Sequence, residues 1–181
     1  AGAKLRRKRP CLSLNLQPSE TQHVSRILEF LYVGGESAAC DRQALRDMGI
    51  VCVVNATATG PSFFLDDPEL KTVRVPLEDE PSESLLRHLE PALEAIEEAR
   101  GLGGAVLVQC KRGMSRSPSI VLAYLLKHRH MRLLEAFQLT RSRRPQISPN
   151  PGYMAQLVHL ETDLFQGQAT LDAGKYALDR Y

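Results

Sequence analysis

The feature that most constrains the fold is a pair of apolar segments joined by a short polar loop. Residues 105–108 form an apolar, β-branched run of the kind found in strands buried on both faces. After the loop 110–116, residues 117–129 are strongly apolar and long enough for a buried helix, and Pro118 is tolerated in its first turn. A strand that runs through a loop into a helix is the repeating unit of an α/β fold.

Other segments of the chain favour the same fold class. Apolar runs bounded by turn residues predict strands at 27–33, 50–54 and 73–77. Spacings of three and four residues between apolar positions predict helices at 36–48, 82–100, 131–142 and 151–165, with Gly49 ending the first and Pro91 bending or splitting the second. Strands that alternate with helices imply an α/β fold with a twisted, mostly parallel central sheet flanked by helices.

The distribution of charge suggests how the 181 residues are organised. We expect a basic and polar N-terminal tail over 1–23, one folded domain over 24–165 and a polar C-terminal tail over 166–181. The formal net charge is +2, but five cations lie between positions 4 and 9, and without them the chain is net acidic. A nucleic-acid-binding domain has a basic face, so a nucleic acid partner is not expected.

Cysteine and histidine usage argues against a metal site. The four cysteines form no C-x-x-C pair, and the five histidines make no ligand set. No apolar run approaches the roughly 18 residues that span a bilayer, and no long apolar stretch follows the basic N-terminus. We therefore expect a protein of the cytoplasm or the nucleus, with no metal, cofactor or membrane partner.

The loop after the strand at 105–108 has the residues of a nucleophilic phosphate site. Backbone N–H groups of a loop that leads into a helix can converge on an anion, and the helix N-terminus adds positive potential. The same field stabilises a thiolate at Cys110, and Arg116 can bind two phosphate oxygens bidentately. Gly113 permits a tight turn, and the Ser117 hydroxyl can donate to the sulfur when it leaves.

These residues resemble the signature of a known family. Residues 110–116 match the C-x5-R pattern of cysteine phosphatases, and the sequence C-x-x-G-x-S-R-S resembles its dual-specificity version. Residues 75–80 are similar to the family's general-acid loop, residues 123–126 to the helix after the signature, and residues 144–153 to its C-terminal segment. The resemblance extends over about 24–165.

The resemblance implies a reaction and a set of roles. It implies metal-independent hydrolysis of phosphotyrosine and of phosphoserine or phosphothreonine through a phosphocysteine intermediate. Cys110 is then the nucleophile, Arg116 the phosphate clamp, Asp79 the general acid and Asn150 a residue that braces the loop. The phosphate-binding loop comprises Lys111, Arg112, Gly113, Met114, Ser115 and Arg116.

One departure from the family pattern keeps other functions open. The family has histidine directly before the nucleophile, where this chain has Gln109, which can form hydrogen bonds but carries no charge. A phosphoprotein-binding module with little turnover is therefore an alternative. A phosphatase of lipid or RNA phosphate esters is another, because the same loop serves those relatives and Lys111 and Arg112 would suit them.

Other residues admit two interpretations. Asp79 lies in an acidic loop and could be only a solvated charge. Cys52 lies inside an apolar strand, which predicts a core residue. The arginines at 141, 143 and 144 could be a solvated helix end or a second site for phosphate or acidic substrates.

The N-terminal tail contains a further motif, in which a basic cluster precedes two leucines spaced by one residue. It resembles a docking motif for mitogen-activated protein kinases, with cations for an acidic patch and leucines for an apolar groove. It also resembles a nuclear-import signal, and a basic tail with neither role is the third interpretation. The candidate docking residues are Arg6, Arg7, Lys8, Arg9, Leu12 and Leu14.

Overall fold

The structure, a computed structural model, describes residues 24–179 and contains one five-stranded sheet in that range. The strand order is β1-β2-β5-β3-β4, and every neighbouring pair is parallel except β1 and β2. The mostly parallel α/β sheet expected from the sequence is therefore confirmed. The strands are β1 (Val24–Leu28), β2 (Leu31–Gly34), β3 (Ile50–Asn55), β4 (Lys71–Arg74) and β5 (Ala105–Gln109).

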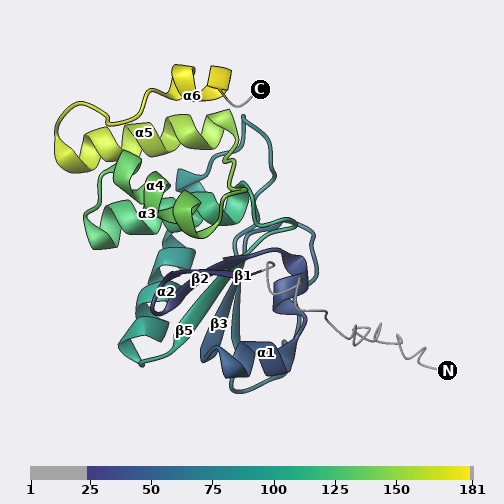
Figure 1. The fold of residues 1–181 in the computed structure, drawn as a ribbon. Helices are drawn as coiled ribbons and strands as arrows, with labels where there is room; N and C mark the ends of the chain where they lie inside the picture. The colour runs from purple at the N-terminus through teal and green to yellow at the C-terminus, as the bar shows by residue number, and fades with distance from the viewer. Residues whose placement is uncertain (1–23, 180–181) are drawn as a thin grey trace.

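Helices cover both faces of the sheet. Helix α1 packs on one face, helices α2 to α5 pack on the other, and α6 lies over α5 on the side away from the sheet (Figure 1). The α-helices are α1 (Arg42–Asp47), α2 (Glu90–Gly101), α3 (Arg116–Arg129), α4 (Leu133–Arg143), α5 (Pro151–Phe165) and α6 (Ala173–Asp179), with short 3-10 turns η2 (Glu36–Ala39) and η3 (Leu86–His88).

Strand β5 and helix α3 form the centre of the molecule. Val106 and Val108 point into the larger core beneath α2 to α5, while Leu107 points into the smaller core beneath α1. All five residues of β5 are buried, and so is every residue of α3 from Ser117 to Leu126. The loop that joins them is therefore anchored at both ends in closely packed structure.

Three predicted elements differ from those observed, and one of them is the strand expected at 73–77, which is observed as β4 at Lys71–Arg74. The single strand expected at 27–33 is a β-hairpin, because the chain reverses after Leu28 and pairs it with Leu31. The single helix expected at 36–48 is the turn η2 followed by α1, because Asp41 caps α1 by accepting a hydrogen bond from the Ala44 N–H at 3.0 Å. Apolar periodicity runs through both breaks and does not reveal them.

Other boundaries follow the expected signals. Gly49 follows α1 with φ of +68°, a conformation that favours glycine, and Pro91 lies in the first turn of α2, after η3. The segment expected to be a polar C-terminal tail carries α6, whose Tyr176 ring packs edge-to-face on Phe137 of α4.

Candidate active site

The loop between β5 and α3 lies at the carboxyl ends of the parallel strands, where α/β sheets bind ligands. It borders a pocket of about 490 Å³. Both the predicted nucleophile and the predicted general acid reach this pocket, although they are 31 positions apart in the sequence. The pocket is lined by Asp79, Cys110, Lys111, Arg112, Met114, Ser115 and Arg116.

The Cys110 sulfur lies in a buried, hydrogen-bonded position. Its side chain is 2 % exposed, and its Sγ accepts from the Gly113 N–H and from the Ser117 hydroxyl, each at 3.2 Å. Gly113 has φ of +67°, and a Cβ atom there would lie 2.6 Å from the Gly34 carbonyl. Glycine is thus required at the position that turns its N–H toward the sulfur.

Arg144 clasps the loop from behind. Its Nε donates to the Gly113 carbonyl at 2.6 Å and its Nη2 to the Arg112 carbonyl at 3.1 Å. The residue is 2 % exposed, and burial lowers the pKa of its guanidinium from the ordinary value, although arginine keeps its charge. Two loop carbonyls are thereby directed toward a cation outside the pocket, and positive charge lies close to Cys110.

Asp79 is held by residues from two other parts of the chain. Its Oδ1 accepts from the Ser115 hydroxyl at 2.6 Å and from the Asn150 side-chain amide at 3.1 Å. The Asn150 backbone N–H in turn donates to the Ser115 hydroxyl oxygen at 3.0 Å. Asn150 also caps α5, since its Oδ1 accepts from the Tyr153 N–H at 2.9 Å. The start of α5 therefore orients the carboxylate.

Close packing fixes the segment around Asp79 against the same helix. A Cβ atom on Gly152 would lie 1.8 Å from the Pro81 carbonyl, so glycine is the residue that lets the two backbones meet. The Tyr153 hydroxyl donates to the Glu78 carbonyl, and burial raises the pKa of that phenol. These contacts and the hydrogen bonds of Asn150 hold the acidic loop on both sides of Asp79.

Arg116 is the last residue of the signature and Gln109 is the residue directly before it. The Arg116 Nη1 donates to the Leu77 carbonyl at 3.3 Å, while its Nε is buried and has no hydrogen-bond partner within residues 24–179. Gln109 is 1 % exposed, and its Oε1 likewise has no partner among the described residues. The position where the family has histidine is thus a buried, uncharged amide with an unused acceptor.

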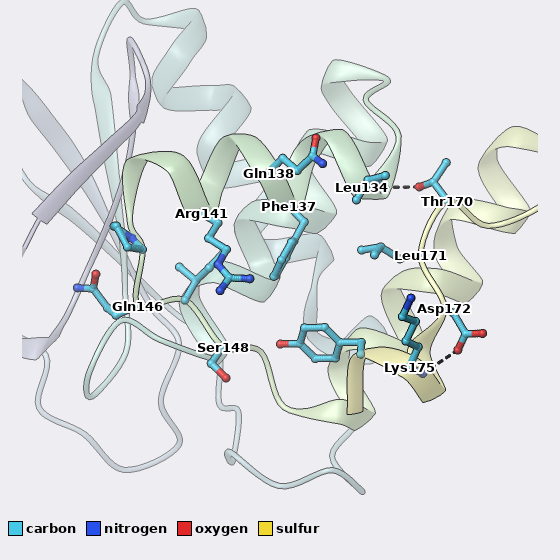
Figure 2. Close-up of a pocket in the computed structure, with 13 residues that line it drawn as sticks. Leu134, Phe137, Gln138, Arg141, Gln146, Ser148, Thr170, Leu171, Asp172 and Lys175 are labelled. Atoms are coloured by element: carbon cyan, nitrogen blue, oxygen red, sulfur yellow. Dashed lines mark hydrogen bonds between the residues drawn. The ribbon is translucent and has the colours of Figure 1, made fainter. Parts of the chain in front are cut away.

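The three arginines at the end of α4 do not act as a group. Arg144 is buried behind the loop, which contradicts both interpretations made for it from the sequence, whereas Arg143 is exposed. Arg141 lines a separate groove of about 790 Å³ between α4 and the α6 segment, where it faces Lys175 across Phe137 and Leu171 (Figure 2). A helix-end charge pattern cannot separate an exposed from a buried arginine.

The structure thus brings most predicted site residues together. Cys110, Arg116 and Asp79 line one pocket. Ser117 and Asn150 support it through their hydrogen bonds to Cys110 and Asp79. Sequence reasoning did not identify Gly152 and Tyr153 as contacts of the acidic loop, although both lie in the segment 144–153 that resembles the family's C-terminal segment. The candidate docking residues between 6 and 14 lie outside the described residues.

Within residues 24–179, no group of three or more His, Cys, Asp and Glu side chains could hold a metal ion. In the same range, no helix is long and apolar enough to cross a membrane.

Comparison with known proteins identifies the family. Residues 31–163 match the family described as dual specificity phosphatase, catalytic domain. Dual specificity phosphatase 28 of Homo sapiens is 40 % identical over 153 residues, which cover 84 % of this chain and 85 % of that protein. Dual specificity protein phosphatase 14 of Homo sapiens is 37 % identical over 148 residues, which cover 82 % of this chain and 73 % of that protein.

A solved structure agrees with this match. The crystal structure of a mouse putative dual specificity phosphatase complexed with zinc tungstate superposes with a TM-score of 0.77 at 38 % identity, covering 85 % of this chain and 96 % of that one. The chain therefore belongs to the dual specificity phosphatase family and is a cysteine-dependent protein phosphatase.

Proposed function

We propose that this protein hydrolyses phosphotyrosine and phosphoserine or phosphothreonine in proteins through a phosphocysteine intermediate. The observation that carries the proposal is the pocket in which Cys110, with two donors on its sulfur, lies together with Asp79 and Arg116. A nucleophile, an acid and a phosphate-binding cation in one pocket are the groups that phosphate monoester hydrolysis requires.

In the first step, the Cys110 thiolate attacks the phosphorus atom and forms the S–P bond. The P–O bond to the substrate breaks, and the Asp79 carboxyl group protonates the departing oxygen. Arg116 and the backbone N–H groups of residues 111–116 bind the phosphate oxygens, whose charge they neutralise. Within residues 24–179, the only hydrogen bond that Arg116 would give up in order to do so is the one to the Leu77 carbonyl, at 3.3 Å.

In the second step, water hydrolyses the phosphocysteine. The Asp79 carboxylate accepts a proton from the water, whose oxygen attacks phosphorus, and the S–P bond breaks to release inorganic phosphate. The Ser117 hydroxyl, 3.2 Å from the sulfur, donates to the thiolate as it leaves. The cycle returns both groups to their starting states and consumes no cofactor.

The test is a panel of phosphate esters assayed with the intact protein and with Cys110→Ser. The substrates are a small aryl phosphate, phosphotyrosine and phosphothreonine peptides, a phosphoinositide and an RNA 5′-phosphate. We expect turnover of the aryl phosphate and of both peptides, all of it lost in Cys110→Ser. Tungstate and vanadate, tetrahedral oxyanions like phosphate, should inhibit, whereas a chelator should not.

The same panel decides between the alternatives. Turnover of the phosphoinositide or the RNA 5′-phosphate in preference to both peptides would assign the activity to lipid or RNA esters. Peptide binding without turnover of any ester would favour the phosphoprotein-binding module, for which Gln109 is the relevant departure from the family.

We also propose that residues 24–165 are the catalytic domain, preceded by a tail at 1–23 and followed by the segment 166–181, whose helix α6 packs on α4, in a protein of the cytoplasm or nucleus. The family match over 31–163 supports these bounds.

The basic and leucine residues between 6 and 14 would dock a mitogen-activated protein kinase. Leu12→Ala with Leu14→Ala should then weaken the kinase complex and leave aryl phosphate turnover unchanged. If loss of the basic residues alters only nuclear accumulation, the motif is an import signal.

A further inference from the structure

A second pocket adjoins the active site. It measures about 380 Å³ and shares Asp79, Lys111 and Arg116 with the pocket that contains Cys110. The residues next to the phosphorylated residue of a protein substrate must lie against the surface around the catalytic pocket. A pocket that shares three lining residues with it is in position to receive one of them.

One wall of the second pocket is the loop 57–62 between β3 and β4, which contributes Thr57, Thr59 and Gly60. This loop has no regular secondary structure, yet Arg74 at the end of β4 holds it by three close contacts. The guanidinium donates to the Thr57 carbonyl, to the Gly60 carbonyl and to the Ser62 hydroxyl, each at 2.8 Å. One side chain thus fixes the beginning, middle and end of the loop.

Asn55 anchors the same loop from below. This buried side chain donates to the Pro61 carbonyl at 2.8 Å and to the Ser62 hydroxyl at 3.0 Å, and it accepts from the Thr57 hydroxyl at 2.6 Å. A Cβ atom on Gly60 would lie 2.5 Å from the Thr57 hydroxyl oxygen, so the loop also packs closely on itself. A wall built in this way has a defined shape before substrate binds.

The remaining lining of the pocket is mostly acidic. Asp79 and Arg116 take part in phosphoryl transfer. The other charged residues that line the pocket are three carboxylates, Glu36, Glu78 and Glu80, and one ammonium group, that of Lys111. A positively charged side chain in this position would meet an excess of carboxylates, whereas an acidic one would be repelled.

We propose that this pocket is a subsite for a lysine or arginine next to the phosphorylated residue, and that Arg74 is the positioning residue that sets its wall. The inference rests on the proposed protein phosphatase function and adds a preference in the substrate. Arg74 is itself exposed and contacts none of the catalytic groups, so its loss should alter peptide recognition and leave the chemistry unchanged.

The test compares Arg74→Ala, Arg74→Lys and the unmodified protein on two substrates. For a phosphotyrosine peptide with flanking lysines, we expect the KM of Arg74→Ala to rise about tenfold with kcat unchanged, as for loss of uniform binding energy. For a small aryl phosphate, both constants should stay the same. Arg74→Lys keeps one donor group, so its KM for the peptide should lie between those of Arg74→Ala and the unmodified protein. Arg46→Ala is the matched control, because it removes an arginine outside the pocket that pairs with Glu69.

A second variant tests the subsite without loosening the loop. Thr59 is exposed and lines the pocket, so Thr59→Lys should raise the KM of the lysine-flanked peptide and lower that of its glutamate-flanked counterpart. Equal KM values for the two peptides in the unmodified protein would overturn the subsite. A parallel loss on peptide and aryl phosphate in Arg74→Ala would overturn the positioning role. Absence of aryl phosphate turnover in the unmodified protein would instead contradict the proposed function.

Discussion

Two buried cysteines, one within a strand and one directly after the neighbouring strand, show how position decides chemistry. Cys52 lies within β3 and Cys110 directly after β5, and both pack in the same core cluster, with exposures of 1 % and 2 %. Burial raises the pKa of the Cys52 thiol to about 11, so it remains protonated. The Cys110 sulfur instead accepts from an N–H and a hydroxyl group. The strand interior isolates a thiol, whereas the strand end surrounds it with donors.

The largest expected effect separates the two cysteines directly. Cys110→Ser should reduce turnover of every substrate below detection and still bind a phosphopeptide, because the loop N–H groups and Arg116 remain. Cys52→Ser should leave kcat unchanged. Steady-state kinetics and fluorescence titration with a labelled phosphopeptide measure both properties. Turnover that survives in Cys110→Ser would refute the nucleophile assignment.

The acid that acts with Cys110 gives the next effect. Asp79→Asn should lower kcat by about 10²–10⁴-fold on a phosphoserine peptide, because its alkoxide leaving group needs protonation. An activated aryl phosphate should lose much less. Equal losses on both substrates would assign the proton transfer to another group, and Glu78→Gln and Glu80→Gln then become the variants to assay.

Removing one donor should make Cys110 resemble Cys52. Ser117→Ala removes a hydrogen bond to the Cys110 sulfur that becomes stronger as negative charge develops on the leaving thiolate. We therefore expect phosphocysteine hydrolysis to slow by about 10²-fold. The intermediate should accumulate, so stopped-flow traces with an aryl phosphate should show a burst followed by slow turnover. Slow release without a burst would place the effect of Ser117 on the first step.

The high pKa of Cys52 also predicts how stability depends on pH. The unfolded thiol ionises near pH 8.5 and the folded one near 11, so the unfolded state binds fewer protons between these values and stability falls as pH rises. Cys52 should account for a loss of about 2 kcal/mol between pH 8 and pH 10. Urea unfolding of the intact protein and of Cys52→Ala measures it. Parallel pH profiles for the two proteins would contradict the shift.

The smallest effect concerns Gln109, beside the nucleophile. Because its Oε1 has no partner within the described chain, Gln109→Met should change the free energy of unfolding by less than about 1 kcal/mol or increase it. Gln109→His should raise kcat modestly by restoring the family's residue. A large destabilisation in Gln109→Met would show that the Gln109 amide makes a stabilising contact through an atom other than Oε1.

The sequence was most informative where the signal was local. The run at 105–108 and the apolar helix after it located the catalytic loop, and the spacing of Cys110, Gly113 and Arg116 identified its chemistry. The fold class followed from the alternation of elements. These features depend on neighbouring positions, so periodicity and spacing reveal them.

Long-range contacts could not be predicted in the same way. Asp79 was expected to be the acid, but its partners Ser115 and Asn150 lie 36 and 71 positions away and meet it only in three dimensions. The sequence pattern is compatible with Arg144 at an exposed helix end, whereas its burial depends on the path of the loop that it binds. No local pattern indicates which distant donor a carboxylate or carbonyl will meet.

These distant contacts also bear on how the enzyme acquires its activity during folding. Arg144 joins the loop after β5 to Ser25 of β1, 119 positions away in the sequence, and the Asp79 contacts span 36 and 71 positions. Contacts that close such long stretches of chain form slowly, because their entropic cost precedes their energetic reward. We therefore expect the catalytic pocket to complete its assembly late, so that a nascent or partly unfolded chain lacks phosphatase activity. After dilution from denaturant, turnover should then recover later than the helical signal.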